Sequence, residues 1–268
     1  MNDSKLTWSW LGGFYQAEGC VSNRRLNIEQ KEREPLELIV QFLMYELPNI
    51  RPIKVRGPLE HHTPATRKPT YIHSMTLPKI TTAKVLHKLL PHIHTNVRHK
   101  IIKDTNLQCV ECPLNDDWIA GFWEGDGSIF PASIDVQIAF AQKDKVILEE
   151  IRKYLTHYTS FGNGTIYDYK YPQLIGEKYP SFSVPRLIYH CSMHNQEMLE
   201  WLFRNVRSKF RQLQLGTFLD AIRLYHESSP SKPSKLPNIV EGVPKDFLPG
   251  QPYRMHKWFD LHPEEAIV

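Results

Sequence analysis

The feature that most constrains this chain is a nine-residue pattern that occurs twice. LGGFYQAEG at positions 11–19 matches IAGFWEGDG at positions 119–127. Each copy has the small and aromatic residues of a tightly packed helix and ends in a carboxylate followed by glycine. The carboxylates are Glu18 and Asp126, so the two copies are separated by the length of a small domain. A repeat of this length predicts two related halves.

Further matches follow each copy of the pattern. Gln30, in IEQKE, comes a short distance after the first carboxylate, and Gln142, in FAQKD, comes at a similar distance after the second. NVRHK ends at Lys100 and NVRSK ends at Lys209, a separation that nearly equals that of the two carboxylates. The order carboxylate, glutamine, lysine therefore appears twice.

Small residues form a strip along each repeated helix. Gly13 and Ala17 are four positions apart, as are Gly121 and Gly125, so each pair lies on one helical face. Glycine inside a helix costs about 1 kcal/mol relative to alanine, which indicates a packing reason for it. If the two strips pack together, the two carboxylates arrive side by side.

The carboxylates are expected at the C-terminal ends of these helices, where Gly19 and Gly127 resemble C-cap residues. The negative end of the helix dipole and the neighbouring acid both disfavour ionisation there. A divalent cation would remove this conflict, and two carboxylates with water and phosphate oxygens suit Mg²⁺. The alternative is that each acid lies at a solvated helix end.

The paired motif resembles that of the LAGLIDADG homing endonucleases, in the single-chain form that fuses two halves. The resemblance covers roughly positions 5–216. It implies an α+β fold of two pseudosymmetric αββαββα halves, each a four-stranded antiparallel sheet backed by helices. The paired motif helices would join the halves into a DNA-binding saddle.

The resemblance also implies roles for individual residues. Glu18 and Asp126 would hold two or three Mg²⁺ ions, with the backbone carbonyls of Ala17 and Gly125 nearby. Glu18 departs from the aspartate of the namesake motif, and its longer side chain is expected to make the cuts in the two strands unequal.

The glutamines and lysines match two further positions of the family. Gln30 and Gln142 match the position that holds metal-bound water, unless they only end a strand. Lys100 and Lys209 match the basic residue that organises water or stabilises charge. Alternatively, the two lysines are phosphate anchors or surface residues.

Alternating polarity predicts strands that carry polar side chains on one face. In CVSNRRLNIEQ, Leu26 and Ile28 alternate with Arg25, Asn27 and Glu29. Such polar rows suit the major groove of DNA, although a solvated sheet face is the alternative. The candidate DNA contacts, including basic residues for phosphates, are Arg24, Arg25, Asn27, Glu29, Lys54, Arg56, Arg67, Lys68, Ser133, Asp135, Gln137, Tyr167, Tyr169, Lys170, Lys178 and Arg186.

The second half has the clearest strand pattern, ASIDVQIAF at positions 132–140. Its expected inward residues are Ile134, Val136, Ile138 and Phe140, and its expected outward residues are Ser133, Asp135, Gln137 and Ala139. Helices are expected at 35–47, 80–93, 146–155 and 197–206, with further strands at 50–57, 70–77, 162–171 and 185–193. Asn115, Asp116 and Asp117 should cap the second motif helix.

These elements divide the chain into a first half at 1–108, a linker at 109–116, a second half at 117–216 and a tail at 217–268. The tail should begin with a helix at about Thr217 and continue as a proline-rich segment without its own core. The net charge is +4 overall, and the tail holds slightly more acidic than basic residues, so the repeated body is more basic than the whole chain. This mild excess is compatible with nucleic acid.

The four cysteines include a CxxC pair, Cys109 and Cys112. Cys20 and Cys191 are distant in sequence, and the 13 histidines show no matching metal-ligand spacing. Reduced thiols in a linker are therefore preferred over a structural zinc site. The sequence has no apolar run long enough to span a membrane and no secretory leader, so neither a membrane-embedded nor a secreted protein is expected.

The sequence thus predicts a monomeric homing endonuclease that makes metal-dependent, staggered double-strand breaks in a long, asymmetric DNA target. Two alternatives stay open: an RNA maturase that assists splicing of a group I intron by binding intron RNA, and a catalytically silent DNA-binding protein. From family habit and the position of the first motif, we expect an intron-encoded protein that works in the organelle where it is made, a mitochondrion or chloroplast.

Overall fold

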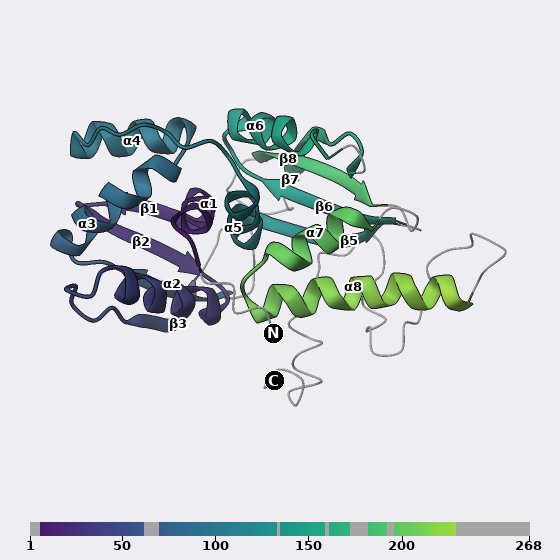
Figure 1. Ribbon diagram of the computed structural model, residues 1–268, viewed down its shortest axis with the longest axis horizontal. Helices are drawn as coiled ribbons and strands as arrows, with labels where there is room; N and C mark the ends of the chain where they lie inside the picture. The colour runs from purple at the N-terminus through teal and green to yellow at the C-terminus, as the bar shows by residue number, and fades with distance from the viewer. Residues whose placement is uncertain are drawn as a thin grey trace, which may run out of the picture.

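The computed structural model describes residues 6–61, 70–132, 135–158, 161–171, 182–191 and 196–228. They form two α+β halves that meet at a central pair of helices (Figure 1). The first half consists of α1 (Trp8–Glu18), β1 (Gly19–Ser22), β2 (Arg25–Gln30), α2 (Arg33–Glu46), β3 (Val55–His61), β4 (Thr70–Thr76), α3 (Lys79–Leu89), the 3-10 helix η1 (Leu90–His92) and α4 (Thr95–Thr105).

The second half repeats this order. It consists of α5 (Asp116–Asp126), β5 (Gly127–Ala132), β6 (Asp135–Ala141), α6 (Lys145–Leu155), β7 (Thr165–Tyr171), β8 (Phe182–Cys191), α7 (Glu197–Asn205) and α8 (Lys209–Ser228). The strand orders of the two sheets, β1-β2-β4-β3 and β5-β6-β8-β7, are equivalent, and all pairings are antiparallel. The predicted pair of pseudosymmetric halves is confirmed.

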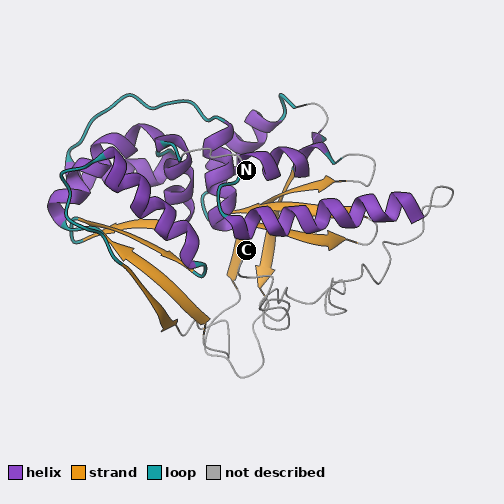
Figure 2. Cartoon of the chain, turned by 60° about the horizontal axis from the view of Figure 1, so that its bottom comes forward, coloured by secondary structure: helices purple, strands orange, loops and turns teal. Residues whose placement is uncertain are grey.

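Alternation of polarity explains how each sheet meets its helices. On β2, Leu26 and Ile28 are 1% exposed, whereas Arg25 and Glu29 are exposed. The apolar face packs against α1, α2 and α3, which lie on one side of the first sheet (Figure 2). The opposite face of the strand is left to solvent, as the period of two predicts.

The second sheet corrects two expectations. The stretch 132–140 is not one strand, because β5 ends at Ala132 and β6 begins at Asp135. Ala139 was expected to point outward into solvent, but it is fully buried. β6 lies in the interior of the sheet between β5 and β8, so neighbouring strands cover this small side chain on both sides.

The stretch expected as one helix at 80–93 is divided, and a separate helix follows it. Helix α3 ends at Leu89, η1 contains Pro91, and α4 begins at Thr95 after an extended residue, His94. In the second half, the helix expected from Thr217 already begins at Lys209, so it crosses the predicted boundary between positions 216 and 217. Each half therefore has one more α-helix than the predicted αββαββα order, and the first half also contains the 3-10 helix η1.

Each half has its own hydrophobic core, and the motif helices contribute to both. Ala120 of α5 belongs to the core cluster of the first half, and Ala17 of α1 packs against that of the second half. The two cores are therefore joined through α1 and α5. Within the described ranges, no helix is long and apolar enough to cross a membrane.

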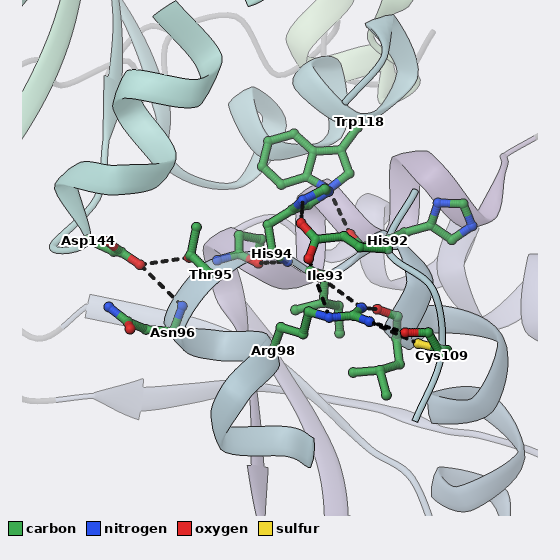
Figure 3. A network of polar contacts seen from close by, with 12 residues as sticks. His92, Ile93, His94, Thr95, Asn96, Arg98, Cys109, Trp118 and Asp144 are labelled. Atoms are coloured by element: carbon green, nitrogen blue, oxygen red, sulfur yellow. Dashed lines mark hydrogen bonds and ion pairs between the residues drawn. The ribbon is translucent and has the colours of Figure 1, made fainter. Parts of the chain in front are cut away.

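The N-terminus of α4 is held by the opposite half. Asp144, which precedes α6, accepts hydrogen bonds from Thr95 Oγ1 at 2.7 Å and from the Asn96 amide at 3.4 Å (Figure 3). A carboxylate at this end also interacts favourably with the positive end of the helix dipole.

The N-terminus of α8 is held in a related way. Glu34 of α2 accepts hydrogen bonds from the amides of Lys209 at 2.9 Å and Phe210 at 3.2 Å. Glu124 of α5, only 2% exposed, accepts from the amides of Arg207 and Ser208. The closing helix of each half is thus capped by an acid from the other half, which locks the halves together.

Candidate active site

Two glycines set the distance between the motif helices. A Cβ atom at Gly13 would overlap the main-chain oxygen of Trp118, and a Cβ atom at Gly121 would overlap that of Trp10. The helices therefore cross with their backbones in contact, and a side chain at either glycine would force them apart. The predicted strip of small residues is confirmed.

Aromatic residues pack the two helices in matching ways. The rings of Trp10 and Phe14 stack with centroids 5.0 Å apart, and those of Trp118 and Phe122 stack at 5.3 Å. All four side chains are fully buried. This matched packing fixes the positions of both helices along their shared length.

Polar bonds across the helix pair fix its N-terminal ends. Thr7 and Asn115 are the N-caps of α1 and α5. Thr7 Oγ1 donates to Asp117 Oδ2 at 2.8 Å, and Ser9 Oγ donates to Asn115 Oδ1 at 2.7 Å. The predicted capping of α5 by Asn115 is confirmed, and each cap is bonded to the other helix.

The two carboxylates meet at the opposite end of the pair. Glu18 and Asp126 are the last residues of α1 and α5. A Cβ atom at Gly125 would lie 2.6 Å from Ala17 Cβ and 3.0 Å from Glu18 Cγ, so the last turns are in direct contact. The small strip therefore brings the acids together, as the sequence predicted.

The glycines that follow the acids are the C-caps of α1 and α5, as predicted, and their amides donate to the main-chain oxygens of Tyr15 and Trp123. Gly19 has φ −92° and Gly127 has φ −78°, so both are extended and start a strand at once. They are small for a steric reason, because a Cβ atom at either one would overlap the ring of Tyr15 or of Trp123.

Burial disfavours the ionised forms of both acids, and the charge of Glu18 adds to this effect at Asp126. Burial raises the pKa of Glu18 to about 7, although the Arg211 charge and the Gln30 amide favour its carboxylate. Burial, followed by the charge of Glu18, raises the pKa of Asp126 to about 8. Two adjoining acids with raised pKa values are a recognised sign of a functional site.

The predicted glutamines both reach this region but make different contacts. Gln30 Nε2 donates to Glu18 Oε1 at 3.1 Å. Gln142 Nε2 donates to the main-chain oxygen of Gln16 at 3.2 Å, across the boundary between the halves. The structure therefore joins Gln30 directly to Glu18 and joins Gln142 to the backbone of α1, the helix that ends in the same acid.

Arg211, in the first turn of α8, is a site residue that the sequence reasoning missed. Its Nη2 donates to the main-chain oxygens of Glu124 at 3.2 Å and Gly127 at 3.0 Å, and its guanidinium lies 4.8 Å from the centre of the Trp123 ring. Burial lowers its pKa, whereas nearby carboxylates, including Glu18 and Asp126, favour its charged form.

The repeated NVRxK sequence does not mark equivalent positions. Asn96–Lys100 lies inside α4, whereas Asn205–Lys209 runs from the end of α7 to the first residue of α8. Counted from the helix starts, Lys209 corresponds to Thr95 and Arg211 corresponds to Val97. The sequence held no signal for Arg211, because the helix that carries it was expected to begin only at about Thr217. The roles proposed for Lys100 and Lys209 stay predictions.

The oxygen atoms at the helix ends fit a divalent cation. Glu18 and Asp126 supply adjoining carboxylates, and the charge of Glu18 disfavours ionisation of Asp126. Ala17 and Gly125, one position before each acid in the last helical turns, are the residues whose main-chain oxygens would add to this set. Among the described residues, no group of three or more His, Cys, Asp or Glu side chains could hold a metal. The remaining ligands of such an ion would be water and phosphate oxygens, as Mg²⁺ prefers.

The cysteine pair of the linker lies apart from the acids. Arg98 of α4 donates to Cys109 Sγ at 3.3 Å and forms an ion pair with Glu111 at 3.4 Å (Figure 3). The Cys112 amide donates to the main-chain oxygen of Pro91 at 2.7 Å. Among the described residues no cysteine forms a disulfide, and Arg98 fastens the linker to the first half.

The first sheet brings several predicted DNA contacts onto its solvent face. Glu29 of β2 and Arg56 of β3 are both paired with Ser74 of β4, so the three side chains form one row. Asn27 is paired with Thr76 in the next row of this face. The remaining predicted contacts, Arg24 in the β1–β2 turn, Arg25 at the start of β2 and Lys54 before β3, are exposed.

The second sheet has a corresponding face. Arg186 of β8 is paired with Tyr167 of β7, which is 48% exposed, and Gln137 of β6 shares the face. Asp135 lies at the start of β6, and Tyr169 and Lys170 lie on β7. The other predicted contacts, Arg67, Lys68, Ser133 and Lys178, lie outside the described residues.

Comparisons by sequence find nothing: no protein-family model and no curated protein matches the chain. Solved structures do match. A structure of the LAGLIDADG meganuclease I-AabMI bound to uncleaved DNA superposes with a TM-score of 0.51 at 14% identity, covering 83% of this chain and 92% of that chain. The meganuclease I-SmaMI bound to uncleaveable DNA gives 0.48 at 13% identity, with coverages of 87% and 94%. The N-terminal LAGLIDADG domain of DUF199/WhiA gives 0.44 at 14% identity, with coverages of 80% and 89%.

Proposed function

We propose that this chain, which has the LAGLIDADG fold, is a site-specific DNA endonuclease that depends on a divalent metal ion and cuts both strands of a long, asymmetric target. The observation that carries the proposal is the meeting of Glu18 and Asp126 at the ends of two crossed helices. The fold match to I-AabMI, a meganuclease seen bound to DNA, supports it.

The acids would hold the metal together with the main-chain oxygens of Ala17 and Gly125. A divalent cation, when bound there, supplies Lewis-acid activation of water and of the scissile phosphate. The raised pKa values of both carboxylates mean that the free protein binds protons at this place near neutral pH. Binding of Mg²⁺ would therefore displace those protons.

Other residues of the chain would orient water and stabilise charge. Gln30 and Gln142 each have the side-chain oxygen fixed by the next amide of the chain, at 2.7 and 2.8 Å, so the amide group is held in place. Such a group can position an attacking water. Arg211 stands beside both acids and supplies positive charge where negative charge develops on the phosphate.

The two sheets would place the DNA over this site. Their solvent faces carry donors and acceptors in rows, such as Glu29 with Arg56 and Tyr167 with Arg186. Side chains in such rows can contact base edges in the major groove. Because the rows of the two halves differ in composition, the two half-sites of the target should differ in sequence.

The experiment is a cleavage selection on a DNA library of long randomised sites. Wild-type protein and the variant Glu18→Gln/Asp126→Asn are incubated with the library in Mg²⁺ and, separately, in Ca²⁺. We expect double-strand breaks at one long site with Mg²⁺, and binding without breaks for the variant. Binding without cutting by the wild type in any metal would instead identify a silent DNA-binding protein.

A second candidate function, binding of structured RNA, is favoured by the charge of the helical side of the first half. The segment 79–105, which contains α3 and α4, holds five lysines and one aspartate, besides Arg98, which is buried and paired with Glu111. Lys79, Lys84 and Lys103 are exposed there, away from the solvent face of the sheet. In the second half, α6 and α7 together carry equal numbers of basic and acidic side chains.

Charge reversal separates this candidate from the first. The variant Lys79→Glu/Lys84→Glu/Lys103→Glu should lose affinity for structured RNA, with a weaker salt dependence, and should still cut DNA. Equal RNA binding by wild type and variant would remove the candidate.

A further inference from the structure

The two glutamines of the site occupy related positions but are held by different groups. Each lies at or just beyond the end of the second strand of its half, and each bonds its own next amide through Oε1. The Nε2 group of Gln30 then donates to Glu18 within its own half, whereas that of Gln142 donates to Gln16 of the opposite half.

Arg211 accounts for this difference. Gln16 and Glu124 are equivalent residues, each two positions before an acid, and each side chain accepts the amide that precedes the closing helix of its half, His94 or Ser208. The main-chain oxygen of Glu124 accepts from Arg211, and that of Gln16 accepts from Gln142. The residue of α4 that corresponds to Arg211 is Val97, whose side chain has no donor, so the oxygen of Gln16 is left for Gln142.

Gln16 is itself fixed by the first half. Its side chain is 3% exposed, and its Oε1 accepts the main-chain amide of His94 at 3.1 Å. His94, also 3% exposed, is the N-cap residue of α4; its ring bonds Glu111 through Nδ1 and meets the edge of the Trp118 ring (Figure 3). The side chain of Gln16 therefore sets the position of the backbone that holds Gln142.

We propose that Gln16, fixed by His94, is a positioning residue for Gln142, and that one of the two strand cuts depends on this contact between the halves while the other does not. The proposal rests on the proposed endonuclease function. The first-half glutamine needs no such support, because it bonds directly to Glu18.

The contact can be tested on the free protein without any cleavage. In Gln16→Met the acceptor of the His94 amide is lost while the side-chain volume is kept. We expect the side-chain amide resonance of Gln142 to shift in this variant and that of Gln30 to stay, in ¹⁵N NMR spectra. An unchanged Gln142 resonance would overturn the positioning contact, whether or not the protein cuts DNA.

Cleavage of the selected target, followed separately on each strand, tests the consequence. The DNA strand whose cleavage is slowed by Gln142→Met is the strand that depends on Gln142. Gln30→Met, the matched control, should slow cleavage of the other strand. Gln16→Met should slow the Gln142-dependent strand about tenfold and the other strand less than about twofold, so that nicked DNA accumulates.

A double-variant cycle excludes a general loss of structure. In the Gln142→Met background, Gln16→Met should slow cleavage little further. In the Gln30→Met background, it should slow cleavage as much as it does in the wild type. Equal slowing of both strands by Gln16→Met, or full additivity with Gln142→Met, would contradict the proposal. A wild type that cuts no DNA would refute the endonuclease function, and the NMR result would still decide the positioning contact.

Discussion

The two motif helices are alike where they pack and different where they end. Along their crossing, α1 and α5 make matching contacts: Gly13 faces α5 as Gly121 faces α1, and each helix stacks a tryptophan on a phenylalanine. At the carboxylate end, the first helix has Gln16 and Glu18, and the second has Glu124 and Asp126. Close packing tolerates little divergence, whereas the polar surroundings of the acids are free to differ.

The difference follows from a single cation. Arg211 of α8 bonds the end of α5, and its counterpart on α4 is the apolar Val97. One side of the site is therefore organised by a guanidinium and the other by a glutamine amide. Four tests break or sharpen this comparison.

The largest effect on stability is expected from substitutions in the matching crossing of α1 and α5. Gly13→Val and Gly121→Val should each lower the free energy of unfolding by more than about 3 kcal/mol, because the new side chain meets the backbone of the other helix. Urea unfolding measures this. Gly216→Ala in α8 is the control, since its Cβ would lie 3.5 Å from Phe203; it should stabilise by about 0.5–1 kcal/mol. Wild-type stability in either valine variant would show that the helices do not cross at these glycines.

The next test concerns Arg211, the residue that makes the two helix ends differ. Arg211→Met should slow cleavage of both strands by about 10²–10³-fold, because the charge beside both acids is removed. Arg211→Lys keeps the charge and should recover part of the rate. Single-turnover rates for Lys100→Ala and Lys209→Ala serve as comparison. If either lysine variant loses more activity than Arg211→Met, the lysine rather than the arginine is the main active-site cation.

A third test uses the pH dependence of stability in metal-free protein. The pKa values of both acids are raised, from 4.5 to about 7 for Glu18 and from 3.8 to about 8 for Asp126, so between about pH 4 and pH 8 the folded protein binds more protons than the unfolded chain. The free energy of unfolding should therefore fall as pH rises through this window.

Thermal unfolding in EDTA at pH 5 and pH 8 measures the effect. Between pH 5 and pH 8, the melting temperature of the wild type should fall by at least about 5 °C more than that of Glu18→Gln/Asp126→Asn. Equal losses would show that the acids are not the groups whose pKa values are raised.

The smallest effect concerns the exchanged caps. Asp144→Ala and Glu34→Ala should each cost about 1–2 kcal/mol, because each acid caps the closing helix of the other half. Asp144 also caps its own helix α6 through the Val146 amide, so Glu34→Ala is the variant that isolates the contact between the halves. Glu37→Ala, which removes an exposed ion pair with Arg33, is the control and should cost about 0.3 kcal/mol. A cap variant as mild as the control would show that the lock between the halves adds no stability.

Local sequence patterns were enough to predict much of the fold. The glycine strip and the alternation on β2 predicted the crossed helices and the first sheet face, because both are set by packing at fixed spacing. Boundaries were less accurate. Ala139 is buried and α8 begins at Lys209 because of contacts with distant parts of the chain, such as Glu34.

The site was predicted in part for the same reason. The acids and glutamines follow the motif at short range, and the structure brings Gln30 and Gln142 to the helix ends. Arg211 is far from Asp126 in the sequence, and only the packing of α8 on α5 brings it to the acids. The repeated NVRxK sequence indicated Lys100 and Lys209 instead, but its two copies lie at different positions relative to the starts of α4 and α8.

The most direct test of the central claim is single-turnover cleavage of the selected DNA target by Glu18→Gln and Asp126→Asn separately. If the acids share one site, each single variant should lose cutting of both strands by at least about 10³-fold. Each should still bind the target with nearly wild-type affinity. Continued cleavage of both strands by either variant would contradict a shared carboxylate site at the ends of α1 and α5.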